Sequence, residues 1–118
     1  MAVILLVDDE PGVVNLMRTL LRMSGHEVLT AANGLEGLAV FRSYAKMIDL
    51  IITDLQMPVM DGYEFIGRIR DSKPDAKLIC MSGFSEQGPP KGVAFLPKPF
   101  LPQDARALVN AALGAPVP

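Results

Sequence analysis

Short apolar runs alternate along the whole chain with stretches in which apolar residues recur at helical spacing. The apolar runs have the length of strands and occupy Val3–Val7, Glu27–Ala31, Leu50–Thr53, Leu78–Met81 and Val93–Leu96. Most of them are continuously apolar, which is typical of strands that are buried on both faces of a sheet. Glu27–Ala31 is the weakest of the five, and it follows a glycine at Gly25. The pattern therefore predicts five strands.

The intervening stretches predict amphipathic helices. Apolar residues lie on one helical face over residues 13–21, 35–42, 65–69 and 105–112. Pro11 and Pro102 precede the first and the last of these stretches, and proline suits the first turn of a helix. Strand and helix in strict alternation imply crossover connections and a parallel sheet that is covered on both faces. We therefore predict an α/β fold, a flavodoxin-like doubly wound five-stranded parallel sheet with strand order 2-1-3-4-5.

The connection between the fourth and fifth strands departs from this regular pattern. Only fifteen residues, Gly83 to Pro97, separate Ser82 from Lys98, and they must hold the whole crossover and the fifth strand. The middle of the connection contains two prolines and two glycines, which oppose helix formation. We predict that the helix expected here is absent or shortened to about one turn.

Composition limits the kind of protein. The 118 residues suit a single domain over 1–118, and half of them are hydrophobic. A net charge of −2 and a pI near 5.3 argue against direct nucleic-acid binding. The apolar runs are too short to span a membrane, and the start lacks the features of a signal peptide. A single cysteine, Cys80, excludes an internal disulfide, so we expect a cytoplasmic protein.

Charged and polar side chains follow four of the predicted strands. Asp8 and Asp9 come after the first strand, Asp54 after the third, Ser82 after the fourth and Lys98 after the fifth. Ligands of such folds bind at the carboxyl ends of the strands, where these groups would meet. Clustered carboxylates repel one another and call for a cation, of which Mg²⁺ is the best match to oxygen ligands. An aspartate in such a site can serve as the nucleophile of a phosphoryl transfer. The residue types alone leave open which aspartate does so.

Five motifs in order give the sequence a specific resemblance. They are Asp8-Asp9, Ile-Ile-Thr-Asp-Leu-Gln-Met-Pro around Asp54, Asp61-Gly62, Met-Ser-Gly-Phe at Ser82, and Phe-Leu-Pro-Lys-Pro-Phe at Lys98. Together they resemble the response-regulator receiver domains of two-component phosphorelay signal transduction, over essentially the whole chain.

The resemblance implies a role for each matching residue. Asp54 would be the phospho-acceptor, becoming an aspartyl phosphate with a phosphoryl group taken from a histidine kinase or phosphotransfer protein. Asp9 would bind Mg²⁺ directly and Asp8 through water, with Asp54 and the backbone carbonyl of Gln56 completing the protein ligands.

A second set of residues would form the switch. Ser82 would bond a phosphoryl oxygen, Lys98 would pair with it, and Phe95 would turn inward when Ser82 moves. The resemblance also implies a cis peptide bond between Lys98 and Pro99. The downstream output partner cannot be read from the sequence. Many family members form a dimer through the face made by the fourth helix, the fifth strand and the last helix. The short connection before the fifth strand puts this dimer in doubt.

Three other functions compete with this interpretation. An aspartyl-phosphate hydrolase of the haloacid-dehalogenase type would need a second aspartate two residues after the nucleophile, where this chain has Gln56, and a cap insertion. A flavodoxin would need a hydroxyl-rich phosphate loop where this chain has Asp-Asp-Glu-Pro-Gly. A receiver fold used only as an unphosphorylated interaction module stays open. We expect a phospho-acceptor and not an enzyme acting on a separate substrate.

Overall fold

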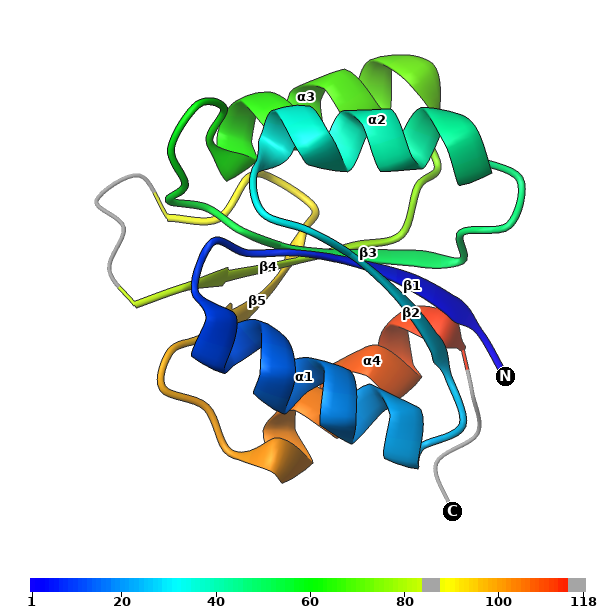
Figure 1. Cartoon of the computed structure of the whole chain (residues 1–118), viewed down its shortest axis with the longest axis vertical. Coiled ribbons are helices and arrows are strands. Elements are labelled where there is room, and N and C mark those ends of the chain that lie inside the picture. The colour runs from blue at the N-terminus through cyan, green and yellow to red at the C-terminus, as the bar shows by residue number, and fades with distance from the viewer. Residues whose placement is uncertain (84–87, 115–118) are drawn as a thin grey trace.

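The computed structural model describes residues 1–83 and 88–114 and shows a parallel sheet between two layers of helices (Figure 1). The strands are β1 (Val3–Val7), β2 (Glu27–Ala31), β3 (Leu50–Asp54), β4 (Leu78–Ser82) and β5 (Ala94–Pro97). The helices are α1 (Pro11–Met23), α2 (Gly34–Tyr44), α3 (Gly62–Ser72) and α4 (Pro102–Leu113). All neighbouring strands pair in parallel, in the order β2-β1-β3-β4-β5. The predicted fold class and strand order are confirmed.

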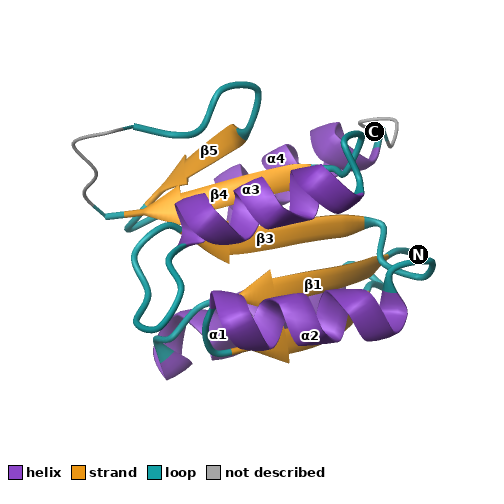
Figure 2. Cartoon of the chain, turned by 90° about the horizontal axis from the view of Figure 1, so that it is seen from above, coloured by secondary structure: helices purple, strands orange, loops and turns teal. Residues whose placement is uncertain are grey.

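Alternation along the strands divides the core into two halves. In β1, Leu5 and Val7 belong to the cluster beneath α2 and α3, whereas Ile4 and Leu6 belong to the cluster beneath α1 and α4. Figure 2 shows the strands running in the same direction between these helix layers. Successive side chains of a strand point to opposite faces, so a continuously apolar run buries both faces of the sheet.

The helices begin where the sequence supplies a cap or a proline. Asn33 accepts a hydrogen bond from the backbone N–H of Glu36, and Asp61 accepts one from that of Glu64, both at 2.9 Å. Pro11 and Pro102 begin α1 and α4 as predicted. No helix in the described part of the chain is long and apolar enough to cross a bilayer.

The connection between β4 and β5 is held by side chains of α3. Its described residues, Gly83 and 88–93, form no helix, which agrees with the prediction; residues 84–87, on which the prediction also falls, lie outside the described residues. The Tyr63 hydroxyl donates to the carbonyl of Gly88 and the Arg70 guanidinium to that of Lys91, both at 2.8 Å. These bonds satisfy backbone carbonyls that a helix would otherwise satisfy internally.

Candidate functional site

Three charged side chains from distant parts of the chain meet at the carboxyl edge of the sheet. Asp8 follows β1, Asp54 ends β3, and Lys98 follows β5. The Lys98 Nζ lies 2.8 Å from Asp8 Oδ2 and 3.4 Å from Asp54 Oδ2. Asp8 and Asp54 are only 2% and 3% exposed, so this ion pairing takes place largely out of water. The structure thus brings together Asp8, Asp54 and Lys98, three of the five residues that the strand ends predicted.

Glu10 is a third carboxylate at this site, and neither the strand-end pattern nor the family motifs indicated it. Its Oε1 lies 3.3 Å from Lys98 Nζ, and one carboxylate oxygen each of Asp8, Glu10 and Asp54 lie within 4.8 Å of one another. Asp9 is exposed and does not belong to this group. The signal that could have found Glu10 is its place directly before Pro11, in the turn that leads from Asp8 into α1.

Backbone contacts fix the two aspartates. Asp8 Oδ1 accepts a hydrogen bond of 2.9 Å from the backbone N–H of Glu10, and Asp54 Oδ1 accepts one of 3.4 Å from that of Gln56. Behind Asp54, the first turn of α3 packs directly on the strand end. A Cβ at Gly62 would overlap the Asp54 carbonyl and would lie 2.6 Å from the Leu55 Cα. Glycine is therefore required at this position for α3 to approach the site.

The two predicted switch residues lie in neighbouring strands, Ser82 at the end of β4 and Phe95 within β5. Ser82 is buried, and its hydroxyl donates to Gln56 Oε1 at 3.1 Å, while its carbonyl accepts from the backbone N–H of Lys98 at 2.9 Å. Phe95 is half-buried against the core cluster beneath α2 and α3. The Lys98–Pro99 peptide bond is cis. The ligand roles of Asp9 and Gln56 and the movement of Ser82 and Phe95 stay predictions.

The pKa shifts follow from this crowding. Burial, followed by the charge of Asp8, raises the pKa of Asp54 above its ordinary value, although Lys98 and the Gln56 N–H act in the opposite direction. Burial disfavours the Lys98 ammonium, but its hydrogen bond to Asp8 and the nearby carboxylates outweigh this, and the pKa of Lys98 is raised. Burial likewise raises the pKa of the Cys80 thiol to about 11, so this cysteine is an inert core residue.

The donor chemistry of the site fits a hard divalent cation. A cleft of about 590 Å³ leads to it, lined on the polar side by Glu10, Asp54, Gln56 and Lys98. Three carboxylates share one ammonium, so the group keeps an excess of negative charge, and its ligand atoms are all oxygens. Oxygen ligands of this kind are those that Mg²⁺ and Ca²⁺ prefer.

Comparisons with known proteins define the class. The profile of the response regulator receiver domain family matches residues 4–110. The chain is 34% identical over 105 residues to the sensor kinase CckA of Brucella abortus, which covers 84% of this chain. The chain belongs to the response-regulator receiver family, which the sequence motifs had indicated.

Two solved structures are closely similar. The response regulator TrrA of Thermotoga maritima in complex with Mg²⁺-BeF is 36% identical, with a TM-score of 0.86 over 96% of this chain and 100% of that one. TrrA in complex with the histidine kinase ThkA is 34% identical, with a TM-score of 0.83 over 96% and 99%. The chain spans only 11% of the CckA kinase and 46% of the probable transcriptional regulator ycf27 of Pyropia yezoensis, to which it is 34% identical.

Proposed function

We propose that this protein is a phospho-acceptor in a two-component phosphorelay, with Asp54 as the residue that receives the phosphoryl group. The observation that carries the proposal is the placement of Asp54: a buried carboxylate that lines a cleft, 3.4 Å from the Lys98 ammonium and within 4.8 Å of a second carboxylate. The donor would be a phosphohistidine on a kinase or phosphotransfer protein, and the complex of the similar regulator TrrA with ThkA supports this class of partner.

In the proposed transfer, an Asp54 carboxylate oxygen forms a bond to phosphorus as the phosphorus–nitrogen bond to histidine breaks. The imidazole leaves with the bonding electron pair and takes up a proton. Lys98 offsets charge on the phosphoryl oxygens, and Asp8 and Glu10 hold the lysine in place. A bound Mg²⁺, held by carboxylates of this edge, would neutralise further charge on those oxygens. The chain acts on itself as acceptor, and we do not assign it a separate substrate.

The switch would run through Ser82. Before phosphorylation its hydroxyl donates to the Gln56 side chain on the rim of the cleft. A phosphoryl group on Asp54 offers stronger, charged acceptors, so the Ser82 hydroxyl would move to it. Phe95 would then turn toward the space behind Ser82, and the surface around β5 would change for an output partner.

The test is phosphorylation from small donors, read by intact mass. With acetyl phosphate or phosphoramidate and Mg²⁺, the wild-type chain should gain one phosphoryl group, and the gain should vanish when Mg²⁺ is removed. Asp54→Asn should abolish it, whereas Asp49→Asn, the same change at an exposed aspartate before β3, should label like wild type. Labelling that persists in Asp54→Asn would place the acceptor elsewhere. No labelling under any condition would favour an unphosphorylated interaction module.

A further inference from the structure

Glu10 differs from the two aspartates of the site in its exposure. Its side chain is 62% exposed and lines the cleft, whereas the side chains of Asp8 and Asp54 are 0% and 5% exposed. Among the described residues its carboxylate contacts Lys98 alone. Glu10 therefore places a negative charge on the path by which a phosphoryl donor reaches Asp54.

We propose that Glu10 selects among phosphoryl donors: it disfavours small dianionic donors, such as acyl phosphates, relative to a phosphoryl group that a protein presents. This inference rests on the function proposed above, because it concerns the same transfer to Asp54. Removing the Glu10 charge leaves the nucleophile unchanged, and the buried Asp8 still holds the lysine through its contact of 2.8 Å.

The charge balance of the cleft carries this proposal. Asp8, Glu10 and Asp54 contribute three negative charges and Lys98 one positive charge, a sum of −2. A divalent cation would bring that sum to zero, and the adjacent carboxylate of Asp9, the predicted direct ligand of that cation, would lower it to −1. The loaded site therefore repels a free dianion more than a monoanion. Glu10 supplies this excess negative charge, because without it the loaded site would be neutral.

The rest of the cleft favours a donor that brings its own surface. Next to Glu10 the cleft is lined by apolar side chains, namely Val13, Leu16, Pro99 and Phe100. A protein that carries a phosphohistidine can cover these side chains and set a cation opposite Glu10. Acetyl phosphate can do neither, and it meets the carboxylate with its full charge.

Two small donors of different charge distinguish the repulsion by Glu10 from changes in metal affinity or in the nucleophile. In both reactions an Asp54 oxygen binds phosphorus; acetate leaves from acetyl phosphate, and ammonia leaves from phosphoramidate, each with the bonding pair. Acetyl phosphate is a dianion at neutral pH, whereas phosphoramidate is a monoanion because its nitrogen is protonated. The ratio of the two labelling rate constants cancels any change in metal affinity or in the nucleophile.

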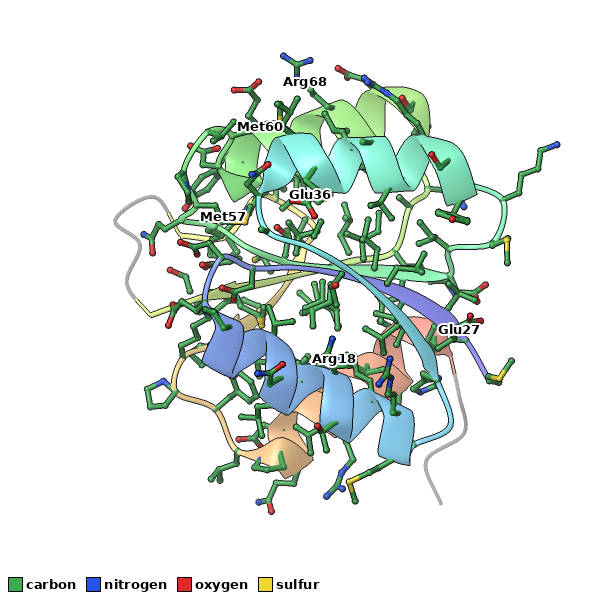
Figure 3. All side chains as sticks on the ribbon, in the orientation of Figure 1. Arg18, Glu27, Glu36, Met57, Met60 and Arg68 are labelled. Atoms are coloured by element: carbon green, nitrogen blue, oxygen red, sulfur yellow. The ribbon has the colours of Figure 1, made fainter. Side chains whose placement is uncertain are left out.

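The experiment measures this ratio at saturating Mg²⁺ and low ionic strength in wild type, Glu10→Gln, Glu10→Asp and Glu27→Gln. Glu27 is an exposed glutamate at the start of β2 and serves as the control. Figure 3 shows it at the opposite end of the molecule from Met57, which lies in the loop that follows Asp54. Glu10→Gln should raise the ratio of acetyl phosphate to phosphoramidate by about threefold, the effect of one charge at about 6 Å in water. Glu10→Asp and Glu27→Gln should keep the wild-type ratio.

The outcomes are distinct. If both donors label every variant and Glu10→Gln leaves the ratio unchanged or lowers it, the selective role of Glu10 is wrong while the phospho-acceptor function stands. If neither donor labels the wild-type chain, both proposals are wrong. The wild-type chain supplies a second test without any substitution: added salt should raise the ratio, because screening the net negative charge of the site removes more repulsion from the dianion than from the monoanion.

Discussion

The two edges of the sheet use titratable side chains in opposite ways. At the amino edge, the His26 Nδ1 accepts a hydrogen bond from the backbone N–H of Ala2 at 3.1 Å, and Asp49 Oδ2 accepts one from that of Val3 at 2.8 Å. Each acceptor there has one fixed backbone donor, and both fasten the start of β1. At the carboxyl edge, three carboxylates converge on the single ammonium of Lys98. The amino edge thus stabilises the fold through paired hydrogen bonds, whereas the carboxyl edge keeps an excess of negative charge.

This difference separates a structural from a functional use of the same residue types. One-to-one hydrogen bonds between a side chain and the backbone stabilise the chain and need no further partner. Buried like charges destabilise the fold, and proteins keep them where a ligand or a reaction uses them. The raised pKa of Asp54, which burial and then Asp8 cause, is a physical sign of that unbalanced state.

Removing Lys98 should have the largest effect on stability. Lys98→Met leaves Asp8 and Asp54 buried without their cation, and we expect the free energy of unfolding to fall by about 3 kcal/mol at neutral pH. Urea denaturation followed by circular dichroism measures the loss. Lys77→Met, at an exposed lysine directly before β4, is the matched control and should change it by less than about 0.5 kcal/mol. Equal effects of the two substitutions would contradict the contrast between the edges.

Removing the Asp54 charge should act in the opposite direction. Because the folded-state pKa of Asp54 lies above its ordinary value of 3.8, the folded chain binds this proton more tightly than the unfolded chain does. Wild type therefore loses stability as the pH rises from that value through the raised pKa. Asp54→Asn lacks this loss and should be more stable at neutral pH by about 1 kcal/mol. If the variant is less stable than wild type at neutral pH, the buried charge of Asp54 does not destabilise the fold.

Features that are local in sequence were predictable. Most of the strands are continuous apolar runs, so the five strands, their order and the polar residues at their ends follow from the pattern and from the rules for parallel sheets. The loss of helix between β4 and β5 followed in the same way from the prolines and glycines of that segment, as far as the structure describes it.

Side-chain direction within a turn was not predictable. Asp9 and Glu10 are adjacent carboxylates, and only the structure shows that Glu10 turns toward Lys98, a residue 88 positions later, while Asp9 is exposed. The bonds by which Tyr63 and Arg70 of α3 hold the β4–β5 connection are likewise long-range. Such contacts depend on how elements pack together, which periodicity does not encode.

A substitution at the amino edge should have a smaller effect on the free energy of unfolding. Asp49→Ala removes the acceptor of the Val3 N–H, but both groups can turn to water because the bond is exposed. The free energy of unfolding should fall by about 0.5 kcal/mol, the lower end of the range for a hydrogen bond. The same denaturation measurement detects it, and phosphorylation from small donors should be unaffected. A loss as large as that of Lys98→Met would mean that the two edges are equally important for folding.

The smallest expected effect is the pH dependence that His26 causes. Burial, followed by the N-terminal ammonium, lowers the pKa of His26, and its Nδ1 must be unprotonated to accept from Ala2. The unfolded chain then binds this proton more tightly, so stability falls as the pH drops from the ordinary value of 6.5 through the lowered pKa. His26 is the only histidine of the chain, so His26→Gln should remove the decline in this range. Because solvent screens the group, the effect should be small. Between pH 7.5 and pH 5.5, the free energy of unfolding from urea denaturation should fall by only about 0.3 kcal/mol more in wild type than in the variant. If wild type and His26→Gln lose the same amount of stability between the two pH values, His26 does not cause the pH dependence in this range.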